Sequence, residues 1–96
     1  MFVVLLRFSE ARSSASQWLA GHQAWLQQGF DDDVFLLSGS LQPQRGGAVL
    51  AHATTLDALR QRVQADPFVA HGVVEAEILD IAASRGDERL HFLLDR

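Results

Sequence analysis

The run FVVLLRF at residues 2–8 is apolar throughout apart from Arg7. A run of seven residues is too short for a typical helix, and its composition predicts a strand. Successive side chains of a strand point to opposite faces of the sheet, so both faces of this strand need a cover. The fold must therefore place this strand inside a sheet that is packed on both sides.

Further segments predict two helices and three more strands. Apolar side chains recur at helical spacing from Ser13 or Ser14 to Gln28, and Gly29 suits the end of that helix. A second helix is expected at 56–64, after two threonines that can cap it. The strands are expected at 34–41, 48–53 and 73–81, with the hairpin PQRGG at 43–47.

The resulting order βαββαβ predicts an α+β, ferredoxin-like fold, with an antiparallel sheet and both helices on one face. No helix then remains to cover the other face of the sheet. A second copy packed sheet to sheet is the economical cover, so we expect a homodimer that forms a dimeric α+β barrel. The tail at 82–96 contains RLHFLL and is expected to form a strand or short helix that helps to pack the dimer.

Composition narrows the classes of function. The 96 residues are expected to form one domain, and the net charge of −4 gives no reason to expect nucleic acid or an acidic membrane as a partner. We expect a cytoplasmic protein, because the chain shows neither a signal-peptide pattern nor an apolar stretch near the roughly 18 residues of a membrane span. Cysteine, lysine and tyrosine are absent. Any catalytic group must therefore be His, a carboxylate, Ser, Thr or backbone.

The four histidines include no pair at the i, i+4 spacing of a helical metal site, and we expect neither a metal nor an organic cofactor. His22 breaks the apolar stripe of the first helix. It can be a core histidine that is hydrogen-bonded to a backbone carbonyl. Alternatively it can serve acid/base chemistry, for which a nearby carboxylate would fix its tautomer.

Asp66 follows the second helix and also has two interpretations. With Pro67 at the first helical position and Gly72 as the stop, it can cap a single helical turn. Its second carboxylate oxygen can at the same time serve a neighbouring group. Because the two helices lie side by side in a ferredoxin-like fold, Asp66 is expected to reach His22.

Four segments together resemble the YCII-related (YciI-like) family. They are GHQAWLQQG around His22, FLLSGSL at 35–41, GGAVLA at 46–51 and ADPFVAHGVVEAEI at 65–78. The resemblance covers about 2–81 and leaves 82–96 as a tail. It implies a dimeric α+β barrel whose active site is centred on a histidine and an aspartate, which fall on His22 and Asp66. Where many members have Gly-Pro in the second-strand motif, this chain has Gly-Ser.

We therefore expect a small-molecule enzyme in which Asp66 orients His22 and His22 transfers a proton in an elimination, isomerisation or hydrolysis. Such an enzyme is a lyase, an isomerase or a hydrolase. Two alternatives stay open: a non-catalytic dimeric module that binds a metabolite, and a cofactor-free oxygenase, which rests on fold analogy alone. The residues expected to contact the substrate are Ser38, Gly39, Phe68 and Trp25.

Overall fold

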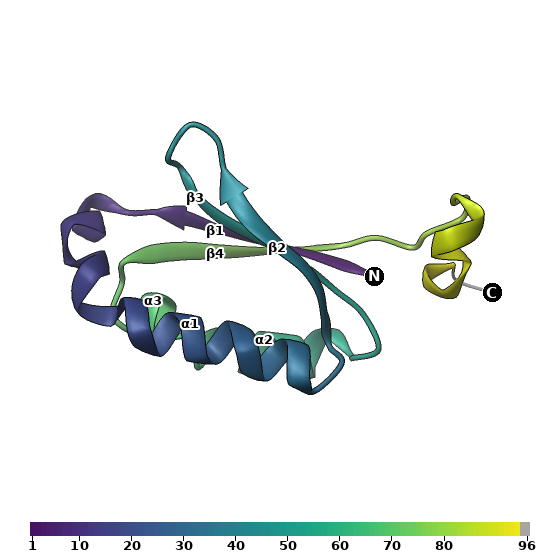
Figure 1. The fold of residues 1–96 in the computed structure, drawn as a ribbon, viewed down its shortest axis with the longest axis horizontal. Helices are drawn as coiled ribbons and strands as arrows, with labels where there is room; N and C mark the ends of the chain where they lie inside the picture. Colours follow the sequence, from purple (N-terminus) through teal and green to yellow (C-terminus); the bar gives the residue numbers. More distant parts are fainter. Residues whose placement is uncertain (95–96) are drawn as a thin grey trace.

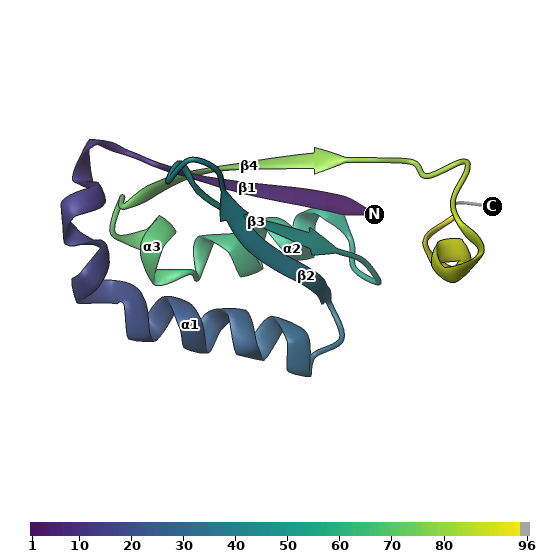
Figure 2. The ribbon, with the colours of Figure 1, turned by 45° about the horizontal axis from the view of Figure 1, so that its top comes forward.

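The computed structural model describes residues 1–94, which form a sheet covered on one face by helices (Figures 1 and 2). The strands are β1 (Phe2–Phe8), β2 (Phe35–Leu41), β3 (Gly46–Ala51) and β4 (Val74–Asp80). The helices are α1 (Ala15–Asp31), α2 (Leu56–Gln64) and α3 (Pro67–Ala70). The strand order is β2-β3-β1-β4 and all neighbours are antiparallel, which confirms the predicted ferredoxin-like α+β fold.

The bounds of α2 and β1 agree with the prediction, whereas the end of α1 does not. This helix continues past Gly29 to Asp31, and Asp33 then takes a positive φ of 59°. Gly29 is buried against the ring of Phe35, and a Cβ atom added there would overlap that ring. The glycine therefore serves close packing between α1 and β2, not helix termination. β3 also begins earlier than predicted, at Gly46.

A short 3₁₀ helix, η1 (Glu10–Ser14), joins β1 to α1 and was not predicted. The hydroxyl of Ser9 begins it by accepting a hydrogen bond of 3.0 Å from the backbone N–H of Ala11. The side chain of Arg12 lies over the ring of Phe8, 4.7 Å from its centre, and donates to the carbonyl of Gln44. η1 is thereby attached to the β2–β3 hairpin.

The core lies between the helices and one face of the sheet. Alternate residues of β1 (Phe2, Val4 and Leu6) are buried there, as the period of two requires. Leu59 of α2 is fully buried against this face and Val63 nearly so. These contacts fix the distance between the helical layer and the sheet.

Within residues 1–94, no helix lies on the opposite face of the sheet (Figure 2). Val3 pairs with Leu50 on one side and Leu79 on the other, and Leu50 pairs with Leu37, so four apolar side chains form a row across the sheet. The side chain of Leu37 is 65% exposed. We call this row the outer apolar row.

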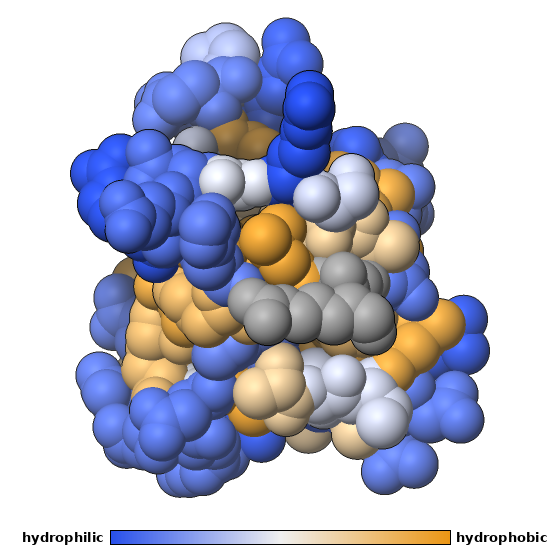
Figure 3. Space-filling view, turned by 90° about the vertical axis from the view of Figure 1, so that its right-hand side faces the viewer, coloured by the Kyte–Doolittle hydropathy of each residue, from blue (hydrophilic) through white to orange (hydrophobic). Residues whose placement is uncertain are grey.

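The tail leaves β4 and ends in a second 3₁₀ helix, η2 (Glu88–Leu93), which confirms the short-helix alternative for RLHFLL. Figure 3 views the molecule from this end, where apolar side chains reach the surface between hydrophilic ones. Leu93 is buried, and the ring of Phe92 meets that of His52 edge to face at 5.7 Å. The tail thus packs on the end of the sheet near the start of β1.

Candidate active site

Asp66 begins α3 as its N-cap. Its backbone is extended (φ −61°, ψ 123°), Pro67 occupies the first helical position, and Oδ1 accepts a hydrogen bond of 3.0 Å from the N–H of Phe68. Gly72, with a φ of 70°, follows the end of the turn. The predicted capping function of Asp66 is confirmed. The carboxylate is fully buried, which is unusual for an aspartate that only caps a helix.

The same oxygen of Asp66 meets His22. Nδ1 of His22 lies 2.8 Å from Oδ1, and the imidazole is 14% exposed. An ionised carboxylate only accepts hydrogen bonds, so a neutral imidazole in this pair carries its proton on Nδ1. Nε2 then carries the free lone pair, which is the acceptor that a general base needs.

Phe68 fixes the plane of this imidazole. Its ring lies parallel to that of His22, with 4.1 Å between the ring centres and 4° between the planes. The hydrogen bond from Nδ1 fixes the rotation of the imidazole, and the stack fixes its tilt. Oδ2 of Asp66 has no hydrogen-bond donor within residues 1–94, so the polar contacts of this carboxylate are concentrated on Oδ1.

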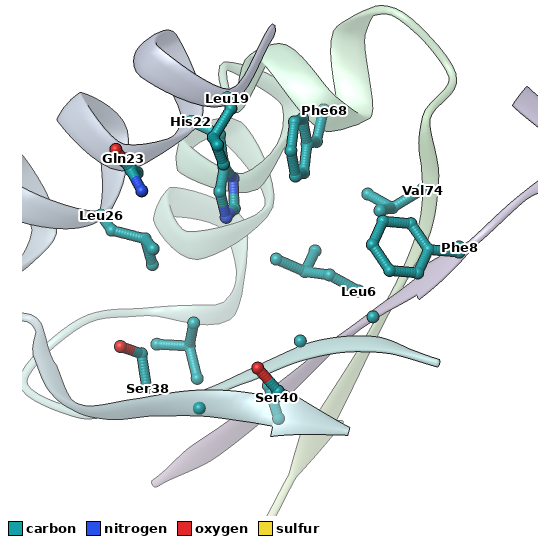
Figure 4. A pocket seen from close by; sticks show the side chains of 15 residues that line it. Leu6, Phe8, Leu19, His22, Gln23, Leu26, Ser38, Ser40, Phe68 and Val74 are labelled. Carbon is teal, nitrogen blue, oxygen red and sulfur yellow. The ribbon is translucent and has the colours of Figure 1, made fainter. Parts of the chain in front are cut away.

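A cavity of about 310 Å³ lies between α1 and the helix-facing side of the sheet, and His22 points into it from α1 (Figure 4). This volume is at the lower end of the range for small-molecule sites. Across the cavity, β2 presents Ser38 and Ser40 (Figure 4). The polar lining side chains are His22, Gln23, Ser38 and Ser40, and the others that line it are apolar or glycine.

Four of the six predicted site residues line this cavity. They are His22, Ser38, Gly39 and Phe68. Asp66 lies behind His22 and is joined to it by the hydrogen bond described above. Trp25 lies outside the cavity lining: it is buried, and its Nε1–H donates to the carbonyl of Arg62 at 2.8 Å.

The sequence interpretation missed Gln23, Ser40 and Gly47. Ser40 follows Ser38 by two positions on a strand, so the period of two could have placed both hydroxyls on one face. Gly47 pairs with Ser40 on one side and with Leu6 on the other, and all three line the cavity. A glycine at this position leaves room that a larger side chain would fill.

Within residues 1–94, no group of three or more His, Cys, Asp or Glu side chains is arranged to hold a metal ion. Of the helices described, none is both long and apolar enough to cross a bilayer. The chemical groups that the cavity offers are therefore an imidazole, an amide, two hydroxyls and the sheet backbone. This set can accept a proton and hydrogen-bond the oxygens of a small ligand.

Fold and site together define a ferredoxin-like α+β domain in which a partly buried histidine at the wall of a small cavity is paired with a buried aspartate. Residues 1–81 match the model of the YCII-related domain, so the chain belongs to the YCII-related family. No curated protein matches the sequence.

Among solved structures, the fold is similar to that of 5-chloro-2-hydroxyhydroquinone dehydrochlorinase (TftG) from Burkholderia phenoliruptrix AC1100, in complex with 2,5-dihydroxybenzoquinone. The TM-score is 0.69 at 16% sequence identity, and the match covers 88% of this chain and 96% of the other. At this identity the match shows the shared fold.

Proposed function

We propose that the protein is an enzyme that acts on a small hydroxylated molecule, with Nε2 of His22 as the general base and Asp66 as the group that orients it. The contact of 2.8 Å between Nδ1 and Oδ1 carries the proposal, because it leaves Nε2 as a proton acceptor at the cavity wall. A proton transfer of this kind needs neither a metal nor an organic cofactor.

Elimination is the reaction that the comparison favours among the three expected classes. In the loss of hydrogen chloride, a base removes a proton from the substrate, and the electron pair of the broken bond moves through the molecule to expel chloride. No oxidant is consumed. The matched enzyme is a dehydrochlorinase by name. A positioned base typically contributes about 10²- to 10⁴-fold to such a step. The hydroxyls of Ser38 and Ser40 line the cavity and would bind the substrate oxygens.

We propose further that the protein works as a homodimer whose outer apolar rows pack against each other. The row of Val3, Leu50, Leu37 and Leu79 lies on the sheet face that no helix covers. A two-fold axis through this face would bring the same side chains of both copies together and close the two sheets into an α+β barrel. Sheet-to-sheet packing at about 10 Å would bury the exposed side of Leu37.

The test is turnover of chlorinated hydroquinones, beginning with 5-chloro-2-hydroxyhydroquinone, followed by chloride release and by mass spectrometry of the product. We expect His22→Gln to reduce the rate by at least about 10²-fold. His52→Gln is the matched control, because His52 lies beside the tail, at the end of β3 that does not line the cavity.

Equal rates for His22→Gln and wild type would overturn the proposal. Binding without turnover, retained in His22→Ala, would identify a metabolite-binding module instead.

A further inference from the structure

The helix that carries Asp66 is too short to be stable by itself. α3 has four residues, and isolated helices of this length do not persist in water. Its position must therefore come from its neighbours, and α1 is the element it packs against most. The approach is close at one point: a Cβ atom on Gly21 would lie 3.0 Å from Cγ of Pro67.

Two parallel ring pairs join α1 to the segment of α3. Trp18 stacks on His71 with 3.5 Å between the ring centres and 4° between the planes. His22 stacks on Phe68 with 4.1 Å and 4°. Trp18 and His22 are four residues apart, which places them on one face of α1, and Phe68 and His71 are three residues apart. We call these four residues the aromatic ladder. Its outer rung is the pair Trp18–His71, and its inner rung is the pair His22–Phe68.

The two rungs of the aromatic ladder differ in burial. Phe68 belongs to the core and His22 lines the cavity. His71 is exposed and Trp18 is partly buried at the edge of the core, so the outer rung is the more exposed one. It holds the C-terminal end of α3 against α1, while Asp66 stands at the N-terminal end of the same turn.

We propose that Trp18 and His71 are positioning residues, which keep α3 in the place where Oδ1 of Asp66 meets Nδ1 of His22. This inference rests on the proposed function of the His–Asp pair. With both ends of the turn held against α1, a rotation of α3 about Phe68 would break the stack of Trp18 on His71. A misplacement of about 1 Å near a catalytic group can cost roughly 10²-fold in rate, so a rung remote from the reacting atoms matters for catalysis.

The test is the protonation pattern of the His22 ring, measured by ¹⁵N NMR at about pH 9, where an ordinary imidazole is neutral. In wild type we expect the proton on Nδ1. In His71→Ala we expect a clear fraction of Nε2–H, the tautomer that an imidazole prefers in water. His71→Phe keeps a flat ring on Trp18 and should restore the wild-type pattern. His91→Ala, in the tail, is the control.

A second readout is kinetic. We expect His71→Ala to lower kcat about ten- to 100-fold with little change in KM, and His71→Phe to recover most of the rate. An unchanged His22 tautomer in His71→Ala and in a folded Trp18→Leu would overturn the inference. If Trp18→Leu does not fold, the His22 tautomer in His71→Ala is by itself the test of the inference. The NMR result needs no substrate, so it separates a failure of this inference from a failure of the proposed reaction.

Discussion

Nδ1 of His22 and Oδ1 of Asp66 lie 2.8 Å apart, although 44 positions of the chain separate the two residues. The same oxygen accepts the N–H of Phe68 at the start of α3. One atom thus takes part both in the fold of a helical turn and in the geometry of the proposed base. Substitutions at Asp66 can separate the two functions.

Asp66→Ser and Asp66→Ala form the first test. Serine is a good N-cap but is too short to reach His22, whereas alanine neither caps nor reaches it. Compared with serine, we expect alanine to lower the free energy of unfolding by about 0.5–2 kcal/mol, as measured by urea denaturation. Both variants should lose the Nδ1–H tautomer of His22. If Asp66→Ser kept this tautomer, the carboxylate would not be what orients the imidazole.

The second test fills the cavity from its sheet wall. A Cβ atom on Gly47 would have only the carbonyl oxygen of Gly39 nearby, at 3.3 Å, so a valine can be accommodated in the strand with small shifts. Its side chain would occupy the space between Leu6 and Ser40. We expect Gly47→Val to remain folded but to lose binding of the hydroxylated molecule that the proposed function requires, measured by calorimetry with a chlorinated hydroquinone that wild type turns over.

The control for this variant is Gly86→Val in the tail, where the nearest atom to an added Cβ atom would be Cδ2 of Leu94, at 3.6 Å. Gly86 is exposed and does not line the cavity. The valine should therefore leave binding unchanged. Equal affinities of wild type and Gly47→Val would show that ligands bind elsewhere.

The proposed dimer can be tested at Leu37, which is the most exposed member of the outer apolar row. Leu37→Lys would place two like charges at an interface that excludes water, which is costly unless they are paired. We expect a shift from dimer to monomer in light scattering. Gln27→Lys adds the same charge on the exposed side of α1 and should leave the dimer intact. A wild-type protein that is monomeric at high concentration would contradict the sheet-to-sheet arrangement.

Asp32 allows a prediction about pH. Arg62 donates to its Oδ2 at 2.9 Å and Gln28 to its Oδ1 at 2.9 Å. These hydrogen bonds, that of Arg62 above all, lower the pKa of Asp32 below its ordinary value of 3.8. A carboxyl group whose pKa is lower in the folded state stabilises the fold above the unfolded-state pKa, and this contribution disappears as the pH falls through the folded-state pKa.

We therefore expect Asp32→Asn to be less stable than wild type at about pH 7 and the difference to be smaller at about pH 2, because this contribution is lost as the pH falls through the lowered pKa of Asp32. Urea denaturation at the two pH values measures the difference in the free energy of unfolding between Asp32→Asn and wild type. Because the pair is exposed, the difference at neutral pH should shrink in 1 M salt. A difference that is the same at both pH values would show that the pair does not stabilise the fold through charge.

Much of the fold could be predicted from local patterns. The bounds of α2 follow from Thr55, whose hydroxyl caps the helix by accepting from the N–H of Ala58, and from the Asp-Pro break after Ala65. Such signals act within a few residues, so the sequence contains them directly. The pairing of His22 with Asp66 could also be anticipated, because the ferredoxin-like order brings α1 and the end of α2 together.

Features that depend on contacts between distant elements could not be predicted in this way. Gly29 has the composition of a helix stop, and only the nearby ring of Phe35 explains why α1 continues through it. The indole of Trp25 turns to the carbonyl of Arg62 and away from the cavity, a choice that helical periodicity does not specify. The stack of Trp18 on His71 requires the exact placement of α3, which no local pattern gives.

The double use of one Asp66 oxygen also affects how relatives of this chain should be compared. A YCII-related protein that lost its chemistry during evolution would still need the Asp-Pro pair to start α3, so that pair would persist in inactive members. The structure gives His22 no comparable part in starting a helix, so under the function proposed above this residue would drift once that function was no longer under selection. Under the same proposal, the histidine is the better marker of a member that keeps the His–Asp chemistry, and the Asp-Pro pair is mainly a marker of the fold.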